Sequence, residues 1–148
     1  MTDQIHALHG ALLDIISVMN RPSRDEALIR ESGIPLDRAL FPLLVVIGRF
    51  GPIGVVDLAD RVGRDHTTVS RQIAKLETLG LVERPGSPGD RRVRNAAVSA
   101  KGKAMTDHVD AARDRLGHAI FQAWDPGDVA ELVRLTRKFA DAVKDDPS

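Results

Sequence analysis

The sequence contains no cysteine and no tyrosine, and aromatic residues make up only 3% of its 148 residues. Without cysteine the chain can form no disulfide framework, no thiolate metal site and no thiol redox sensor. No apolar run approaches the ~20 residues that a membrane-spanning helix needs, so we expect no membrane partner. The N-terminus lacks the basic-then-apolar pattern of a signal peptide, which favours a cytoplasmic protein.

The sequence also has no excess of either charge, because 21 basic side chains balance 21 acidic ones. A neutral chain is not typical of a general polyanion binder. Within residues 61–94, however, eight Lys and Arg face four Asp and Glu, a local net charge of +4. The rest of the chain must then sum to −4. This distribution predicts a basic patch on one face of the molecule.

Residues 55–78 have the pattern of two short helices joined by a turn. In the first helix Val55, Leu58 and Val62 share one face, and Gly63 is suited to a left-handed helix end. The second helix is expected to start at Asp65, whose carboxylate can accept hydrogen bonds from unpaired first-turn amides. Gly80 would end this helix. Its inward apolar stripe consists of Val69, Ile73 and Leu76.

The opposite face of the second helix is small, hydroxyl-bearing and cationic. Thr67, Arg71, Ala74 and Thr78 lie roughly opposite the apolar stripe at 100° per residue. Such a face suits the major groove of DNA, because short side chains allow close approach and arginine can pair with guanine. An ordinary amphipathic helix with a solvated outer face is the alternative interpretation of the same pattern.

A hairpin, or wing, is expected after the second helix. Leu81 to Arg84 alternates like a strand, and Pro85 to Gly89 is interpreted as a loop because it cannot continue a ladder. Val93 to Val98 would form the return strand. Arginines in Asp90-Arg91-Arg92, at the tip, are suited to a narrow minor groove. A solvated basic loop is the alternative.

Helical periodicity continues on both sides of this region. Residues 3–20 form one expected helix; Ser23 and Glu26 then suggest a capping box that opens a short helix to about Glu31. Another helix is expected over roughly Arg38 to Phe50, apolar nearly all round, with Pro42 leaving its start open. Ile53 could add a short strand against the wing.

Two helices are expected after the wing. Ser99 can cap a long helix to about Ala123, and Asp125 with Pro126 marks the start of the last one. The terminal helices carry apolar stripes that a winged helix-turn-helix of ~60 residues cannot cover. We therefore expect these helices to pack against those of a second copy of the chain across a two-fold axis. The candidate dimerisation residues are Ile5, Leu8, Leu12, Leu116, Ile120, Trp124, Leu132 and Phe139.

Four stretches resemble the MarR family of bacterial winged-helix regulators in order and spacing: Leu58–Val62, Thr68–Arg71, Leu76–Arg84 and Asp90–Arg92. The helical flanks fit as well, although Val98-Ser99 replaces the usual Leu-Thr after the wing. The resemblance implies an obligate homodimer that reads a pseudo-palindrome, with Arg92 in the minor groove. The candidate DNA-binding residues are Asp65, His66, Thr67, Thr68, Ser70, Arg71, Lys75, Arg84, Asp90, Arg91 and Arg92.

The expected fold is mainly α with a small β wing, as one MarR-like domain over residues 1–148. Within it, residues 37–99 would form the winged helix-turn-helix, and residues 1–36 and 100–148 the dimerisation helices. The expected function is that of a sequence-specific transcriptional regulator, most simply a repressor, binding double-stranded DNA as a homodimer. A small-molecule effector between the reader and the dimerisation helices is implied by the resemblance alone. Its expected surroundings are Leu12–Ile16, Phe41–Ile47 and Met105–Val109, which core packing explains equally well.

Other functions find less support in the sequence. His6 and His9 lie three apart, but no clear third metal ligand accompanies them, so no metal or cofactor is expected. No phosphate loop or nucleophile motif indicates an enzyme, and Asp57 and Asp60 fit a solvated helix face. A winged-helix module that binds protein instead of DNA remains the alternative, against which Arg71, Arg91 and Arg92 argue.

Overall fold

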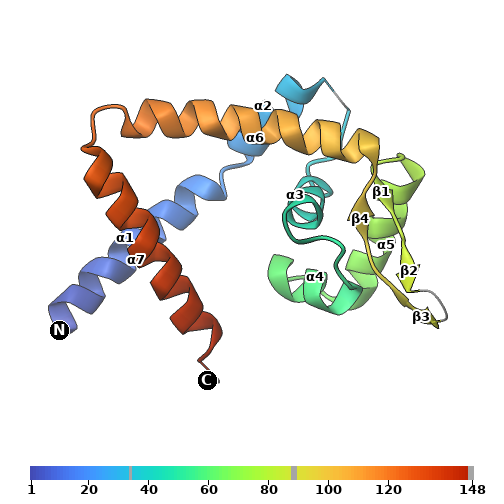
Figure 1. Cartoon of the computed structure of the whole chain (residues 1–148), viewed down its shortest axis with the longest axis horizontal. Helices are drawn as coiled ribbons and strands as arrows, with labels where there is room; N and C mark the ends of the chain where they lie inside the picture. The colour runs from blue at the N-terminus through green and yellow to red at the C-terminus, as the bar shows by residue number, and fades with distance from the viewer. Residues whose placement is uncertain (34, 88–89, 147–148) are drawn as a thin grey trace. The chain divides into compact units, whose positions relative to one another are not determined.

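The computed structural model describes residues 1–33, 35–87 and 90–146; for Pro22, Ser32, residues 86–87 and residues 90–94 it describes the backbone only. The chain is mainly helical with two small antiparallel sheets, which confirms the expected fold class. Its two compact units are Met1–Asp110 and Ala111–Ser148. The elements in chain order (Figure 1) are α1 Thr2–Met19, α2 Pro22–Ser32, α3 Phe41–Phe50, α4 Val55–Val62, α5 His66–Thr78, β1 Val82–Glu83, β2 Gly86–Ser87, β3 Asp90–Arg94, β4 Ala97–Val98, α6 Ala100–Phe121 and α7 Pro126–Lys144.

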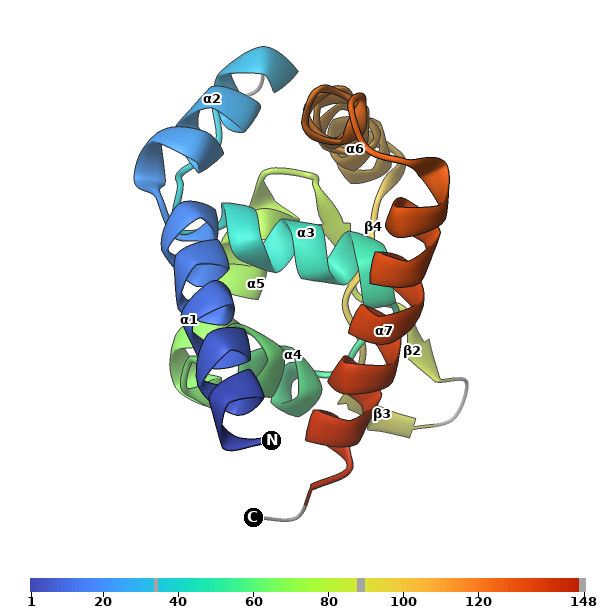
Figure 2. The same cartoon turned by 90° about the vertical axis from the view of Figure 1, so that its left-hand side faces the viewer.

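The core of the first unit lies where α3, α4 and α5 pack together (Figure 2). Helix α4 contributes Leu58, and α5 contributes its complete predicted stripe. The N-terminal half of α6 closes this core, because Met105 and Val109 are buried there. As expected from its composition, α3 is largely inside, with four buried residues: Phe41, Leu43, Leu44 and Ile47.

Helix α3 begins at Phe41, three residues later than the expected Arg38. Residues 38–40 form a turn, and Leu40 is the N-cap. Pro42 therefore falls in the first helical turn, where its missing N–H costs no intrahelical hydrogen bond. The start of this helix, which the sequence left open, is therefore explained by the position of Pro42.

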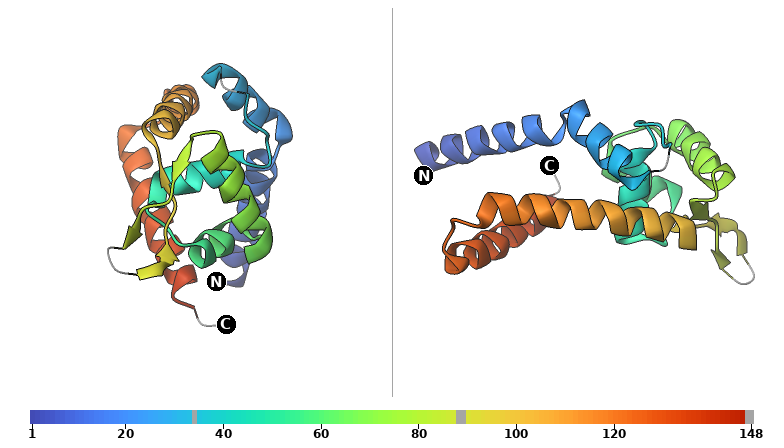
Figure 3. Two further views of the ribbon diagram at one scale, coloured as in Figure 1. Left: turned by 90° about the vertical axis from the view of Figure 1, so that its right-hand side faces the viewer. Right: turned by 90° about the horizontal axis from the view of Figure 1, so that it is seen from above.

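The wing is a hairpin made of two short ladders (Figure 3). Val82 pairs with Val98 at its base, and Gly86 with Arg94 further out. Three expectations were wrong. Residues 86–87 form a strand instead of a loop. The return strand begins at Asp90 instead of Val93, and it is divided between β3 and β4. The division arises because Ala96 leaves the hairpin ladder and bridges Ile53, as was suggested for that residue. Of the rest of the expected loop, Pro85 lies outside the strands as expected, and Pro88 and Gly89 lie outside the described residues.

The N-terminal helices follow the predicted bounds with one correction. Helix α1 spans Thr2–Met19 and buries none of its residues in the single chain. Helix α2 begins at Pro22, with Arg21 as an N-cap that receives no side-chain hydrogen bond. The expected capping box of Ser23 and Glu26 is therefore wrong. Proline at the first helical position moves the N-cap two residues earlier, from Ser23 to Arg21, and places Ser23 inside the helix.

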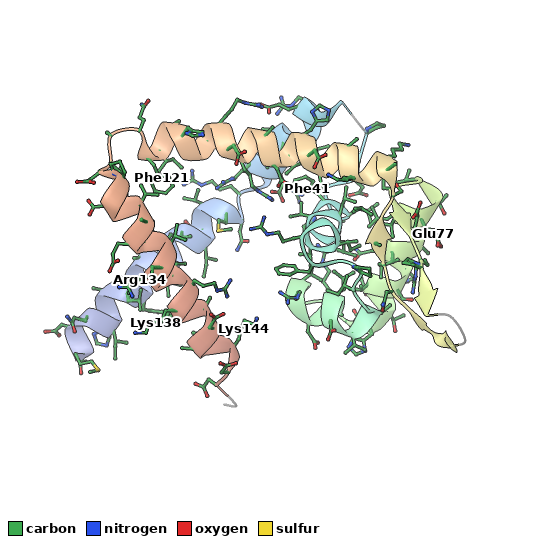
Figure 4. The ribbon with its side chains drawn as sticks, viewed as in Figure 1. Phe41, Glu77, Phe121, Arg134, Lys138 and Lys144 are labelled. Carbon is green, nitrogen blue, oxygen red and sulfur yellow. The ribbon has the colours of Figure 1, made fainter. Side chains whose placement is uncertain are left out.

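The second unit contains the end of α6 and the whole of α7. Asp125 caps α7 by accepting a 2.8 Å hydrogen bond from the Gly127 amide, as predicted. The rings of Phe121 and Trp124 meet edge to face at 5.0 Å. No residue of α7 is buried. Figure 4 shows Arg134 and Lys138 projecting from α7, where Arg134 pairs with Glu131 at 2.6 Å.

Among the described helices, none combines the length and apolar character needed to cross a membrane.

Candidate nucleic-acid interface

Helix α5 has one buried side and one open side. Val69, Ile73 and Leu76 are each 0% exposed, so the helix is fixed in rotation about its axis. The residues expected to face outward are exposed, namely His66, Thr67, Ser70, Arg71, Ala74, Lys75 and Thr78. Thr68 lies at the edge and is half-buried. The structure therefore presents a small, hydroxyl-bearing and cationic helix face to the outside.

The first turn of α5 is held by the carboxylate of Asp65. The backbone amide of Thr68 donates to Asp65 Oδ1 at 2.9 Å, and the Thr68 hydroxyl donates to Oδ2 at 2.6 Å. These two hydrogen bonds, with a smaller contribution from the charge of Arg71, hold the pKa of Asp65 below its usual value. The predicted helix cap is confirmed, and its carboxylate is ionised at neutral pH.

Hydrogen bonds connect the C-terminal end of α5 to the start of α6. The Ser99 hydroxyl donates to the Gly80 carbonyl oxygen and accepts from the Gly102 amide, so it caps α6 as predicted. Lys101 Nζ donates to the Leu79 carbonyl oxygen at 3.0 Å. A Cβ at Gly102 would lie 2.0 Å from the Leu81 carbonyl oxygen, so only glycine allows this approach. Both ends of α5 are thus positioned by specific contacts.

Two arginines of the basic segment have structural partners. Arg64 Nη1 donates to the Ala39 carbonyl oxygen at 2.7 Å and to Gln72 Oε1 at 2.9 Å, tying α5 to the turn before α3. The Arg61 guanidinium lies 3.8 Å from the centre of the Phe50 ring. These roles were not foreseen from the sequence, which counted both residues only as charge. On α5 itself, the exposed Lys and Arg side chains that a ligand could contact are Arg71 and Lys75.

The wing lies beside α5 and extends beyond the β1–β4 ladder (Figure 1). Arg84 follows β1 and is half-buried. The backbones of Asp90, Arg91 and Arg92 form part of β3, but their side chains lie outside what the structure describes. The predicted contacts of these three residues with DNA therefore stay predictions.

The candidate dimerisation residues lie on α1, α6 and α7, except Trp124, which lies in the turn between α6 and α7. Seven of the eight are exposed in the single chain, from Phe139 at 40% to Ile120 at 59%, and Leu12 is half-buried.

The segments expected around an effector differ from one another in burial. Phe41, Met105 and Val109 are buried core residues, whereas Ile15 and Ile16 are exposed. No group of three or more potential metal ligands occurs among the described residues.

The buried core of α3, α4 and α5, the capped helix α5 and the adjoining hairpin together define a winged helix-turn-helix fold. Residues 34–93 match the model of the MarR family. This match covers less than half of the chain, and it agrees with the resemblance that the sequence motifs indicated.

Individual proteins are similar to this chain in part of its sequence or in its fold. An uncharacterized HTH-type transcriptional regulator of Bacillus subtilis, YxaD, is 37% identical over 70 residues, which are 47% of this chain and 49% of that protein. The chain thus matches only about half the length of that relative. A MarR family protein from Bacillus stearothermophilus has a TM-score of 0.75 at 20% identity, covering 97% of this chain and 99% of the other.

A putative MarR family transcriptional regulator from Listeria monocytogenes, solved with a 26mer DNA, has a TM-score of 0.70 at 22% identity, covering 90% of this chain and 89% of the other. At these identities the two structural matches establish a shared fold.

Proposed function

We propose that this protein is a cytoplasmic, sequence-specific DNA-binding regulator of transcription that acts as a homodimer on a pseudo-palindromic operator. The observation that carries the proposal is the outer face of α5, where Thr67, Ser70, Arg71 and Lys75 are exposed on a helix whose other side is fully buried. A rigid helix with short polar and cationic side chains fits the major groove. The relative crystallised with DNA shares this fold and supports the same function.

The homodimer is supported by the apolar surfaces of the terminal helices. Most of the stability of a helix in a protein comes from tertiary packing of its amphipathic face. Neither α1 nor α7 buries a residue in the single chain. The second copy of the chain is the partner that supplies this packing in the proposal. Two readers would then bind half-sites roughly one turn of DNA, or ~34 Å, apart.

Repression is the simplest regulatory outcome, because a dimer that covers a promoter excludes polymerase. The proposal also includes relief of binding by a small molecule, which family resemblance suggests. Such a molecule would have to bind the dimer with an affinity that differs between the DNA-binding and the non-binding arrangement. Isothermal titration of candidate ligands into the free protein and into the protein–DNA complex measures that difference directly.

Selection of bound sequences from a random duplex pool tests the central claim. We expect a palindrome with half-sites about ten base pairs apart, which is one turn of DNA. Affinity for the selected duplex should fall steeply with salt as phosphate counterions are released. If folded, dimeric protein selects no motif, DNA reading is wrong, and a protein-binding winged helix becomes the better description.

A further inference from the structure

The hydroxyl of Thr68 differs chemically from the other hydroxyls on the open face of α5. Its single proton is donated to Asp65 Oδ2 at 2.6 Å, and its backbone N–H is donated to Oδ1 at 2.9 Å. Both donors of Thr68 are therefore committed to one ionised carboxylate. The hydroxyl oxygen keeps its lone pairs, so it can accept hydrogen bonds from a ligand but cannot donate.

The neighbouring hydroxyls are not restricted in this way. Within the described part of the chain, the Thr67 and Ser70 hydroxyls make no hydrogen bond, and both residues are exposed. They can rotate to donate to phosphate oxygens or to carbonyl and N7 acceptors on bases. The first turns of α5 thus contain two kinds of hydroxyl, and the Asp65 carboxylate creates the difference.

Thr68 lies where a base edge can reach it. It shares one edge of α5 with Arg71 and Lys75 at helical spacing i, i+3 and i+7, and it is half-buried instead of enclosed. In the major groove the hydrogen-bond donors are the exocyclic amino groups, N6 of adenine and N4 of cytosine. Phosphates, guanine O6 and N7 and thymine O4 are acceptors, which the Thr68 oxygen cannot bond.

We propose that Thr68 is a specificity-determining residue that accepts a hydrogen bond from one exocyclic amino group in the major groove of each half-site, because Asp65 holds its only hydroxyl proton. The inference rests on the proposed DNA-reading function. Asp65 contributes as a positioning residue: it acts on the DNA through the hydroxyl that it orients.

The test uses the full-length protein and the operator selected from the random pool. At each base pair of a half-site, one duplex replaces adenine by purine, or cytosine by 2-pyrimidinone, to delete the amino group. A second duplex carries the 7-deaza form of the purine, which deletes the N7 acceptor. For the wild type we expect one amino deletion near the α5 contact to weaken binding roughly five-fold, the cost of one hydrogen bond.

Two variants connect that deletion to Thr68. Thr68→Val keeps the branched shape and the backbone cap but has no hydroxyl, so it should bind the intact and amino-deleted duplexes within about two-fold of each other. Ser70→Ala, the matched control, removes a hydroxyl from the same helix face. It should weaken binding to the intact and amino-deleted duplexes equally, so the ratio of the two affinities should stay at the wild-type value. Melting temperatures and circular dichroism of both variants establish that they fold.

Asp65→Asn provides a second readout that a merely structural role would not produce. Asparagine caps helices about as well as aspartate, so the fold is retained. Its amide oxygen can accept from the Thr68 backbone while its NH2 group donates to the Thr68 oxygen. The Thr68 proton is then released toward the groove, and sensitivity should move from the amino deletion to a 7-deaza acceptor deletion.

The outcomes separate this inference from the proposed function. If the wild type selects an operator but Thr68→Val retains every amino sensitivity, Thr68 does not read an amino group and the inference is overturned, while DNA reading stands. The inference is equally overturned if Asp65→Asn leaves the sensitivity on the amino group. If the wild type selects no operator, the proposed function and the inference fall together.

Discussion

At the scale of single residues, the stability of α5 depends on the charge of the Asp65 carboxylate. Both Thr68 hydrogen bonds exist only in the folded chain, and they lower the pKa of Asp65 from the usual 3.8. The unfolded chain therefore binds the proton more readily than the folded chain. The contribution of this cap is fully present above the unfolded-state pKa and is lost as the pH falls through the lower folded-state value.

We therefore expect the wild type to lose stability relative to Asp65→Asn when the pH falls below about 4, the region of an unperturbed aspartate pKa. Between pH 5 and 7 the difference in stability between the two proteins should be constant, because Asp65 is ionised in both the folded and the unfolded wild type. Urea unfolding at a series of pH values measures this difference. Thr68→Val, which removes one of the two bonds, should show a smaller change, and a constant difference down to pH 2.5 would contradict the assignment.

Arg71 is the exposed arginine of α5, and replacing it shows whether its guanidinium contacts a base or a phosphate. Arg71→Ala should weaken operator binding by ~1–3 kcal/mol and relax selection at one position in each half-site if the guanidinium reads a base. A uniform loss on all sequences, with a salt slope smaller by about 1, would identify a phosphate contact instead. Arg61→Ala is the matched control, because that cation lies over Phe50 and should affect binding little.

Part of this site could be predicted from the sequence and part could not. The outward and inward residues of α5 follow from helical periodicity, and Asp65 from its place before the first turn. The sequence did not reveal that Arg64 is tied to Ala39 and Gln72, because residues so far apart in the chain meet only in the folded protein. The Asp-x-x-Thr spacing, in contrast, could have indicated that the Thr68 hydroxyl is committed.

At the scale of elements, the contact between α5 and α6 depends on the missing side chain of Gly102. Gly102→Ala would bring a Cβ to 2.0 Å from the Leu81 carbonyl oxygen, so the start of α6 or the turn after α5 must shift. We expect a loss of ~1–3 kcal/mol in unfolding free energy, typical of overpacking, and weaker operator binding.

Gly117→Ala is the control within the same helix. A Cβ at Gly117 meets nothing within 4 Å, so the higher helix propensity of alanine should add ~0.5–1 kcal/mol of stability. Chemical unfolding of both variants measures the two effects. Similar changes in both would show that the Leu81 contact has no special cost.

The success of the sequence predictions varied with the kind of element. Helices with strong caps were placed closely, as α5 after Asp65, α6 after Ser99 and α7 after Asp125 show. The wing was placed less well, because short strands depend on cross-strand partners that local sequence does not specify. Gly86 and Ser87 read as loop residues, yet they pair with Arg94 and Asp90 across a register shift.

At the scale of the whole molecule, the proposed dimer predicts the effect of a charge on the exposed apolar surface. Ile120→Asp should weaken dimerisation by about 3 kcal/mol or more, roughly 100-fold, because an unpaired carboxylate would be buried between the copies. Operator affinity should fall as well, since two linked readers bind far more tightly than one.

Val56→Asp is the matched control, because Val56 on α4 is 55% exposed and Ile120 is 59% exposed. It places the same charge on an apolar residue outside the proposed dimer surface, and it should leave association unchanged. Sedimentation velocity over a range of concentrations measures both proteins. A monomeric wild type, or equal effects of the two substitutions, would remove Ile120 from the dimer interface.

The lack of buried residues in α1 and α7 has a consequence for the lifetime of the protein. A lone copy exposes two long helices whose local opening costs little free energy, and proteases cleave the chain in such openings. In the proposed dimer, a paired copy would hide the same peptide bonds. Turnover in a cell would then remove single copies first, so the pool that survives would be enriched in molecules able to bind an operator.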